Sequence, residues 1–325
     1  MAASTTYLEA IRQGIWEEME RSENVFILGE DVGVYGGAFK VTEGMIERFG
    51  EDRVIDTPIS EAAIVGAAIG AALMGMRPIA EMQFADFISC AFDQITNFAA
   101  KCRYRWGAGV PMVIRGPSGG GIHGGPFHSQ NPEMPYVHTP GLKVVAPSTA
   151  YDAKGLIKSA IRDEDPVIYF EHKFLYRRIK EVLPEEEYLV PIGKADIKRP
   201  GIDISVITYG AMVHNALEAA TVLAEEGIDL EVLDLRTLLP LDKERVLESV
   251  KKTSKVILLH EDVRTGGMAG ELAAIIAEEA FEYLDGPIMR ITAPDTPVPY
   301  SPPLEEFFFP KTSDIIRVAK QLATY

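Results

Sequence analysis

The segment Asp56–Gly75, with the sequence DTPISEAAIVGAAIGAALMG, constrains the fold more than any other part of the chain. A Thr-Pro turn opens it, and Ser60 is a favourable N-cap, so we expect a helix to begin here. From Ala62 on, the residues are small or apolar, which predicts a helix buried on all sides. Gly66 and Gly70 share one face of this helix and would let another backbone come close. The segment is too short for a membrane span, which needs about 20 apolar residues.

Glu61 is the one charged residue at the start of this apolar helix, and two interpretations of it stand side by side. In the first, its carboxylate interacts favourably with the positive end of the helix dipole, for about 0.3–1 kcal/mol. In the second, the carboxylate is partly desolvated and shares a proton with a nitrogen atom of a ligand. The local sequence alone favours the first, because acidic residues are common in the first turns of helices.

The rest of the chain predicts an α/β fold of two domains. A length of 325 residues exceeds one typical domain. Apolar runs alternate with amphipathic segments, which predicts mostly parallel sheets covered by helices on both faces. Residues 181–199 are charged and contain prolines, as linkers do, so we place the boundary near residue 190. The expected domains are therefore residues 1–190 and 191–325.

Charge and cysteine content limit the partners and the compartment. The 48 acidic and 32 basic residues give a net charge of −16, which disfavours nucleic acid. Cys90 and Cys102 form no CxxC pair and fall in an apolar helical stretch, so we expect buried free thiols in a reducing environment. Neither a signal peptide nor a membrane span is recognisable, and we expect a cytoplasmic protein.

Two glycine-rich turns follow predicted strands. The first, GEDVGVYGG at 29–37, lacks the GxGxxG pattern, and its acids Glu30 and Asp31 would repel a phosphate; we interpret them as turn residues. The second begins at residue 116, where six of the ten residues 116–125 are glycine. Glycine at this density predicts a loop whose backbone approaches another group closely. His123 and His128 lie on it and are candidates for proton transfer.

Several long motifs in a fixed order resemble the β subunit of the E1 component of 2-oxo acid dehydrogenase complexes, and the resemblance covers essentially the whole chain. The motifs are LGEDVG (28–33), DTPISEAAIVGAAIGAALMGMRPIAEMQFADF (56–87), RGPSGGGIHGGPFHSQ (115–130), PGLKVVAPSTAYDAKGLIKSAIRDEDPVIYFEHK (140–173) and VLDLRTLLPLD (232–242).

The resemblance implies a transketolase-like fold, with a pyrimidine-binding domain followed by a C-terminal domain, and thiamine diphosphate as cofactor. It implies that Glu61 hydrogen-bonds the aminopyrimidine ring and promotes the imino tautomer that activates the cofactor. It also implies that Phe87 lies against this ring, with Gln83 among the cofactor-binding residues. His128, in the HSQ motif, is expected to transfer protons during decarboxylation or acyl transfer.

A structural potassium ion is a further implication of the resemblance. The positions implied are Met112, Ala160 and Ile161, through main-chain carbonyls, together with Asp163 and Asp165. At 165 this chain has aspartate where animal relatives have asparagine. On the sequence alone, an ordinary solvated turn before proline is the preferred interpretation of Asp163 and Asp165.

The implied partner is an E1 α subunit in an α2β2 heterotetramer. Thiamine-diphosphate enzymes hold Mg²⁺ and the diphosphate with a GDG…N motif, and no GDG occurs in the 325 residues. The α subunit is expected to supply that motif, so the isolated chain should be inactive. The acidic balance fits docking of a basic subunit-binding domain of E2.

The leading hypothesis is thus oxidative decarboxylation of a 2-oxo acid, with the acyl group passed to lipoamide on E2. The motifs EMQFADF and HSQ look closer to the branched-chain or bacterial pyruvate and acetoin types than to animal pyruvate enzymes. One alternative is half of a transketolase-like carboligase. A second, non-enzymatic alternative is a scaffold subunit in which the apolar helix is only core.

Overall fold

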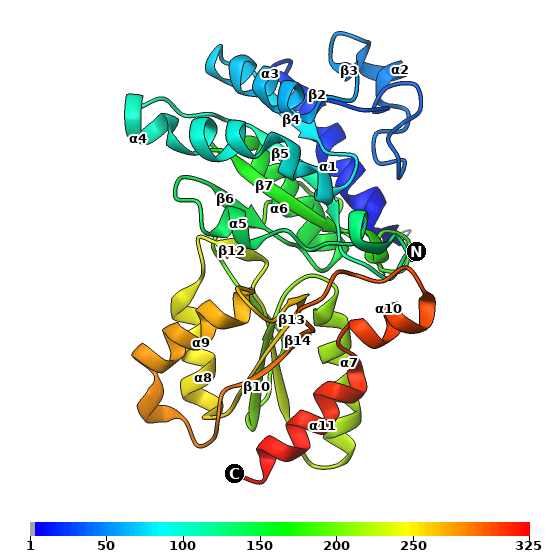
Figure 1. Ribbon diagram of the computed structural model, residues 1–325. Helices are drawn as coiled ribbons and strands as arrows, with labels where there is room; N and C mark the ends of the chain where they lie inside the picture. Colours follow the sequence, from blue (N-terminus) through cyan, green and yellow to red (C-terminus); the bar gives the residue numbers. More distant parts are fainter. Residues whose placement is uncertain (1–3) are drawn as a thin grey trace. The chain divides into compact units, whose positions relative to one another are not determined.

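The computed structural model describes residues 4–325, which form two compact units (Figure 1). The first comprises the chain up to Ser118 together with Pro135–Ile192, and the second comprises Gly119–Met134 and Gly193–Tyr325. The sequence boundary near residue 190 lies next to the second crossing between the units. The glycine-rich segment, expected within the first domain, belongs instead to the second unit, and its hydrogen bonds, described below, explain why.

The first unit is built on a parallel sheet with the strand order β6-β7-β5-β4-β2-β3. Every residue of β2, β5 and β7 is buried, as expected of strands covered on both faces. A short antiparallel pair joins β1 to β8. The strands are β1 (Thr5–Thr6), β2 (Val25–Gly29), β3 (Val54–Asp56), β4 (Arg77–Glu81), β5 (Val113–Ser118), β6 (Lys143–Val145), β7 (Val167–His172) and β8 (Lys180–Glu181).

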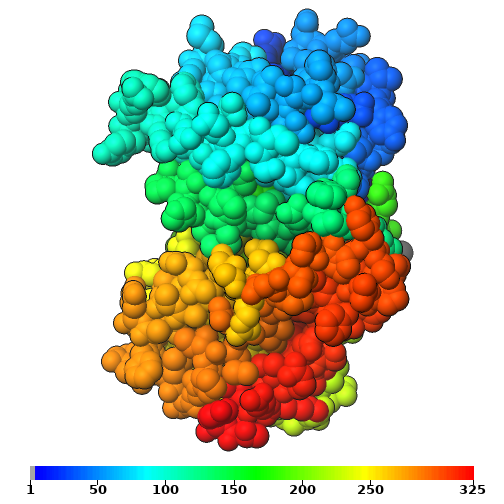
Figure 2. All heavy atoms as spheres, in the orientation of Figure 1, coloured from blue at the N-terminus to red at the C-terminus, as the bar shows by residue number. Residues whose placement is uncertain are grey.

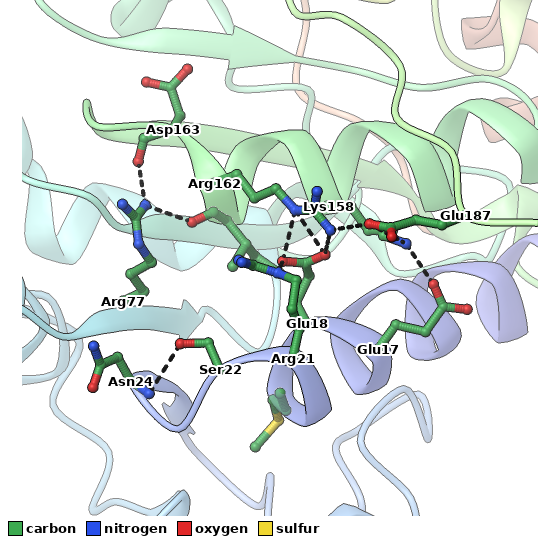
Figure 3. A network of polar contacts seen from close by, with 12 residues as sticks. Glu17, Glu18, Arg21, Ser22, Asn24, Arg77, Lys158, Arg162, Asp163 and Glu187 are labelled. Atoms are coloured by element: carbon green, nitrogen blue, oxygen red, sulfur yellow. Dashed lines mark hydrogen bonds and ion pairs between the residues drawn. The ribbon is translucent and has the colours of Figure 1, made fainter.

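Two long helices of this unit, α1 and α6, pack against each other, and ion pairs join their charged residues (Figure 3). The Glu18 carboxylate is fully buried and accepts hydrogen bonds from Arg162 and, at 2.7 Å, from Arg21. Lys158, 1% exposed, reaches Glu17 at 2.6 Å. The helices of the first half of the chain are α1 (Tyr7–Arg21), α2 (Met45–Phe49), α3 (Glu61–Leu73), α4 (Cys102–Trp106), α5 (Met134–Val137) and α6 (Ala150–Arg162).

Helix α3 forms where the sequence predicts it, but the expectation of complete burial is wrong. One face, which includes Ile64 and Val65, is buried and packs on β4 and β2. The opposite face is exposed and includes Gly66 and Gly70, where an added β-carbon would meet nothing within 4 Å. Blue-to-cyan atoms from this part of the chain form part of the surface in Figure 2. No described segment of this chain covers the face, although its residues are almost all apolar.

The apolar stretch that contains the two cysteines, expected to be helical, is irregular. It consists of 3₁₀ turns at Ala85–Ala91 and Ala99–Lys101, a π-helical turn at Gln94–Phe98, and then α4. This irregularity separates the two cysteines. Cys102 is buried, and burial raises the pKa of its thiol, whereas Cys90 is exposed, contrary to the expectation that both are buried.

The second unit has a sheet with the order β14-β13-β10-β11-β9. All neighbours are parallel except β9, which pairs antiparallel with β11. Helices α7 and α11 lie on one side of the strands and α8 and α9 on the other (Figure 1). The elements are β9 (Asp196–Arg199), β10 (Ile204–Thr208), α7 (Met212–Glu225), β11 (Leu230–Asp234), β12 (Thr237–Leu239), α8 (Lys243–Thr253), β13 (Val256–Val263), α9 (Met268–Glu279), β14 (Met289–Ala293), α10 (Pro302–Phe308) and α11 (Thr312–Ala323).

Two details of this unit differ from the sequence expectation. The end of the predicted linker forms strand β9, whose residues are all half-buried, so it is part of the sheet. The proline-rich sequence 294–303, which locally favours a turn, continues into helix α10, because Pro302 and Pro303 occupy first-turn positions that need no N–H donor. At β9 the pairing with β11 outweighs a local signal for irregular structure, whereas at α10 the prolines themselves suit the first turn of a helix.

Candidate functional site

The carboxyl ends of β2, β3 and β4 lie side by side in the first unit. Gly29, the last residue of β2, is in register with Asp56 of β3 and with Glu81 of β4. The residues that follow these strands therefore gather at the carboxyl end of the sheet, called its carboxyl edge below. Ligands of open α/β sheets bind at this end. The glycine-rich turn after β2 is tied to this edge, since the N–H of Gly33 donates to Oδ1 of Asp56 at 2.6 Å.

Glu61 begins α3 at this edge and is half-buried. Ser60 is the N-cap residue, as predicted, but its hydroxyl makes no capping hydrogen bond. Glu30, directly after β2, is 6% exposed, and its carboxylate has no partner among residues 4–325. Burial raises the pKa of Glu30, and the charges of Glu61 and then Asp31 raise it further. The carboxylates of Glu30 and Glu61 are thus close enough to interact through their charges.

Gln83 and Phe87 lie beyond the end of β4, as the sequence places them. The Gln83 carboxamide donates to Oδ2 of Asp31 at 3.3 Å, which connects it to the turn that carries Glu30. The Phe87 ring is half-buried and packs edge to face on Phe84, with 6.0 Å between ring centroids. Three predicted site residues, Glu61, Gln83 and Phe87, therefore follow strands or begin a helix at the same sheet edge.

Sequence reasoning missed two residues at this edge. It assigned Glu30 to turn chemistry, although its place directly after a buried strand was a signal for a ligand loop. Thr57 was read only as part of a turn. Its N–H donates to the carbonyl of Gly29 at 2.9 Å, while its buried hydroxyl has no hydrogen-bond partner in the described chain. Buried polar groups normally have hydrogen-bond partners. The unpaired side chains of Glu30 and Thr57 therefore indicate that a ligand or a partner chain binds at this edge.

A buried cluster of charged side chains connects the neighbouring strands β4, β5 and β7. The Arg115 guanidinium, 1% exposed, contacts the carboxylates of Glu81 and Glu171. Burial alone would lower the pKa of Arg115, but the charges of Glu171 and Glu81 outweigh it and raise that pKa. Burial raises the pKa of Glu81 in turn, and the Arg115 charge opposes this. The cluster fixes the last residue of β4, Glu81, and the charge of Glu30 also raises the pKa of Glu81.

The two candidate histidines lie in the second unit. His123 has a φ of 59° and its Nδ1 is 2.6 Å from Oε2 of Glu305, a residue of α10 that is 2% exposed. The Gly120 N–H donates to Oε1 of Glu261 at 2.8 Å, which fastens the glycine-rich segment to the end of β13. His128 is half-buried, and its role in proton transfer stays a prediction.

The residues predicted to bind potassium all have protein partners. The carbonyls of Ile161 and Asp163 accept hydrogen bonds from the Arg77 guanidinium at 3.0 and 2.9 Å (Figure 3). Lys143 contacts both carboxylate oxygens of Asp163 at 2.7 Å, and Arg103 pairs with Asp165. The carbonyl of Met112 accepts from Val167 and that of Ala160 from Asp163. Cationic side chains already neutralise this turn, and the potassium site stays a prediction.

Two kinds of feature are absent from the described part of the chain. Across residues 4–325, no three histidine, cysteine, aspartate or glutamate side chains are grouped as metal ligands. Within the same range, every helix is too short or too polar to cross a bilayer.

Comparisons with known proteins identify both domains and the family. Residues 3–178 match the transketolase pyrimidine-binding domain, and residues 193–315 match the transketolase C-terminal domain. The chain is 53% identical to the 2-oxoisovalerate dehydrogenase subunit beta of Bacillus subtilis, with 98% of this chain and 99% of the relative aligned. It is 45% identical to the pyruvate dehydrogenase E1 component subunit beta of the same organism, over 99% and 100% of the two chains.

A solved structure shares the fold. A split-gene transketolase, described as an inactive beta4 tetramer, superposes with a TM-score of 0.80 at 22% identity and covers 100% of this chain and 99% of its own. The two domain matches together span most of the sequence, and the curated relatives are similar over their full length. The chain therefore belongs to the family of E1 β subunits of 2-oxo acid dehydrogenases, built from the transketolase pyrimidine-binding and C-terminal domains.

Proposed function

We propose that this chain, paired with an E1 α subunit, binds the aminopyrimidine ring of thiamine diphosphate at the carboxyl edge of its first sheet. The paired enzyme decarboxylates a branched-chain 2-oxo acid oxidatively and passes the acyl group to lipoamide on E2. The observation that carries the proposal is Glu61, a half-buried carboxylate at the start of an apolar helix and close to the partnerless Glu30. Family membership supports the use of the cofactor.

The residues at this edge fit a heteroaromatic ring. The Glu61 carboxyl group would donate a hydrogen bond to a ring nitrogen and share that proton with it, while Phe87 offers an aromatic surface. Gln83 and the unpartnered Thr57 hydroxyl supply polar groups that such a ring could satisfy. When bound, thiamine diphosphate supplies the nucleophilic carbon and the electron sink for decarboxylation. His128 is proposed to transfer protons during decarboxylation or acyl transfer.

The exposed face of α3 is evidence that a partner chain covers this helix. Ala63, Gly66, Ala67 and Gly70 are exposed, and the two glycines have open space above them. Apolar surface of this kind is normally covered in the working protein. An α subunit on this face would come next to Glu61 and would bring the Mg²⁺ and diphosphate site that this sequence lacks.

Substrate choice is proposed from the relatives. The higher identity to the 2-oxoisovalerate enzyme, 53% against 45% for the pyruvate enzyme of the same organism, favours a branched-chain 2-oxo acid. Pyruvate is the second candidate, because the chain is also 45% identical to the pyruvate enzyme's β subunit. Acetoin, a carboligase half-reaction and a pure scaffold role lack a comparable observation. A basic subunit-binding domain of E2 is proposed as a further partner because the chain carries a net charge of −16.

The test is reconstitution of the chain with E1 α, E2 and E3, with thiamine diphosphate and Mg²⁺ added. NADH formation is then measured with 2-oxoisovalerate, pyruvate and acetoin at equal concentrations. The proposal expects lipoamide-dependent NADH formation to be fastest with 2-oxoisovalerate and absent without the α subunit. Faster turnover of pyruvate than of 2-oxoisovalerate would change the proposed substrate to pyruvate. Assembly with the α subunit that needs no cofactor and gives no turnover would favour the scaffold role.

A further inference from the structure

A cavity of about 410 Å³ opens within the second unit, at the carboxyl end of β13. Its walls come from the glycine-rich segment, the end of β13, the loop after β14 and the last residue of α10. The volume falls in the range of about 300–1,000 Å³ usual for small-ligand sites. It is distinct from the residues of the first unit assigned above to the cofactor.

The topology of the sheet favours a ligand at this end. From β10 the chain continues to β11 on one side and later returns to β13 on the other, so the connections after β10 and β13 diverge. Ligands of open α/β sheets bind in such a crevice, outside the carboxyl ends of the strands. Tyr209 follows β10, and its ring stacks on His260 of β13 with 6.4 Å between centroids. Both side chains are buried, and the Tyr209 hydroxyl has no hydrogen-bond partner in the described chain.

Two neighbouring carboxylates give the cavity its charge. Glu261 is 8% exposed and accepts from the Gly120 N–H at 2.8 Å and from the Asn131 carboxamide at 3.2 Å. Asp262 accepts the N–H of Val263 at 2.7 Å, and its carboxylate has no cationic partner among residues 4–325. None of the described residues that line the cavity is lysine, arginine or histidine. Burial also lowers the pKa of His260, the residue before Glu261, to about 4, so its imidazole carries no positive charge at pH 7.

Part of the remaining wall is apolar, beside one threonine and two carboxamide side chains. Phe127, Val298 and Phe308 line the cavity, and Val298 and Phe308 belong to one buried hydrophobic cluster with Ala293. Phe127 is 63% exposed although its neighbours in the segment are packed against the unit. An exposed ring beside two carboxylates provides both a flat apolar surface and negative charge to the same ligand.

We propose that this cavity binds an ammonium or guanidinium group carried on a short apolar stem. The cationic head would form charge-assisted hydrogen bonds with Asp262 and Glu261, and the stem would pack on Phe127 and Phe308. An anion is disfavoured by the two carboxylates. A divalent metal ion is disfavoured because no group of three acidic, histidine or cysteine ligands exists in the described chain. The cation is either a free amine or a lysine or arginine side chain of a partner chain.

Benzylamine is the probe for this site, and benzyl alcohol is its neutral match in shape. Calorimetry with the full chain should detect benzylamine binding that is at least about tenfold tighter than that of benzyl alcohol. Asp262→Asn keeps the shape and should weaken benzylamine binding about tenfold, whereas the exposed Glu282→Gln should not change it. Phe127→Ala, an exposed position, should weaken both probes. Equal binding of the two probes, or no effect of Asp262→Asn, would overturn the proposal.

The pH dependence adds a readout that packing alone would not produce. Burial raises the pKa of Asp262 to about 6, and the charges of Glu261 and Asp295 add to it. Benzylamine binding should therefore strengthen as the pH rises through about 6 and then level off, and Asp262→Asn should remove this step. A pH-independent affinity between 5 and 8, in a window set by that pKa, would contradict the role of Asp262.

The reconstituted complex with the α subunit separates the two sources of the cation. Benzylamine binding that persists in the complex assigns the cavity to a free amine. Binding that is lost in the complex, together with weaker association of the Asp262→Asn chain, assigns it to a side chain of the partner. These readouts do not depend on turnover, so they remain interpretable if the proposed substrate or cofactor roles fail.

Discussion

Gly14 of α1 lies against Ile157 of α6 so closely that an added β-carbon would fall 2.4 Å from Cγ2 of that isoleucine. The same β-carbon would lie 3.1 Å from the carbonyl oxygen of Lys154, which is backbone and cannot rotate away. Glycine at this position therefore sets how closely the two helices approach. The ion pairs of Glu18 with Arg162 and of Lys158 with Glu17 depend on that approach.

Gly14→Ala is expected to destabilise the chain. Overpacking costs about 1–3 kcal/mol, and the better helix propensity of alanine returns at most about 1 kcal/mol. Urea denaturation monitored by circular dichroism should show a lower free energy of unfolding at unchanged denaturant slope. An unchanged or higher stability would mean that α1 and α6 can move apart without loss.

Gly66→Ala is the matched opposite case, because a β-carbon there meets nothing within 4 Å in this chain. The isolated chain should gain up to about 1 kcal/mol from helix propensity. If the α subunit covers α3 closely, the same methyl group should weaken αβ assembly, which analytical ultracentrifugation can measure. Normal assembly of this variant would place the α subunit elsewhere.

Glu30→Gln tests the electrostatics of the candidate site. The pKa of Glu30 in the folded chain is raised by burial and by Glu61 and Asp31, so its protonated form stabilises the fold and this contribution is lost as the pH rises through the raised pKa. Glutamine does not ionise. The variant's stability relative to wild type should therefore level off below the ordinary value of 4.5 and increase above it. The exposed Glu23→Gln is the control, and parallel pH profiles for wild type and Glu30→Gln would contradict the raised pKa of Glu30.

Glu305→Ala tests what holds the glycine-rich segment in the second unit. The Glu305 carboxylate accepts the N–H groups of Gly121 at 3.0 Å and His123 at 3.2 Å. Losing this acceptor should cost about 1–3 kcal/mol. Amide hydrogen exchange in the segment 119–128 should become faster, whereas the exposed neighbour Glu306→Ala should leave it unchanged. Unchanged protection in Glu305→Ala would show that other contacts hold the segment.

The sequence predicted the strands and the parallel sheets well, because short buried strands appear as apolar runs such as VFIL before Gly29. It also placed Glu61, Gln83 and Phe87 after strands or at a helix start, where the structure has them. It did not predict which unit holds the glycine-rich segment. The partners of that segment, Glu261 and Glu305, lie 141 and 182–184 residues later in the chain, beyond any local pattern.

The error about α3 has a different cause. Its composition indicates burial on all sides, and the structure shows burial on one side only. An apolar residue pattern reports burial in the assembled protein, and it does not say whether the covering surface belongs to the same chain. The missed role of Glu30 is similar, because adjacent acids in a turn suit both capping and a ligand site, and only burial distinguishes the two.

The central claim, that Glu61 activates the cofactor, is tested most directly by Glu61→Gln in the enzyme reconstituted with the α subunit. Circular dichroism and sedimentation should show an intact fold and normal assembly, with the exposed Glu51→Gln as control. Lipoamide-dependent turnover of 2-oxoisovalerate should then fall at least about 100-fold, the loss expected on removing a proton-transferring group. Turnover close to that of the wild type in a correctly assembled Glu61→Gln enzyme would contradict the claim.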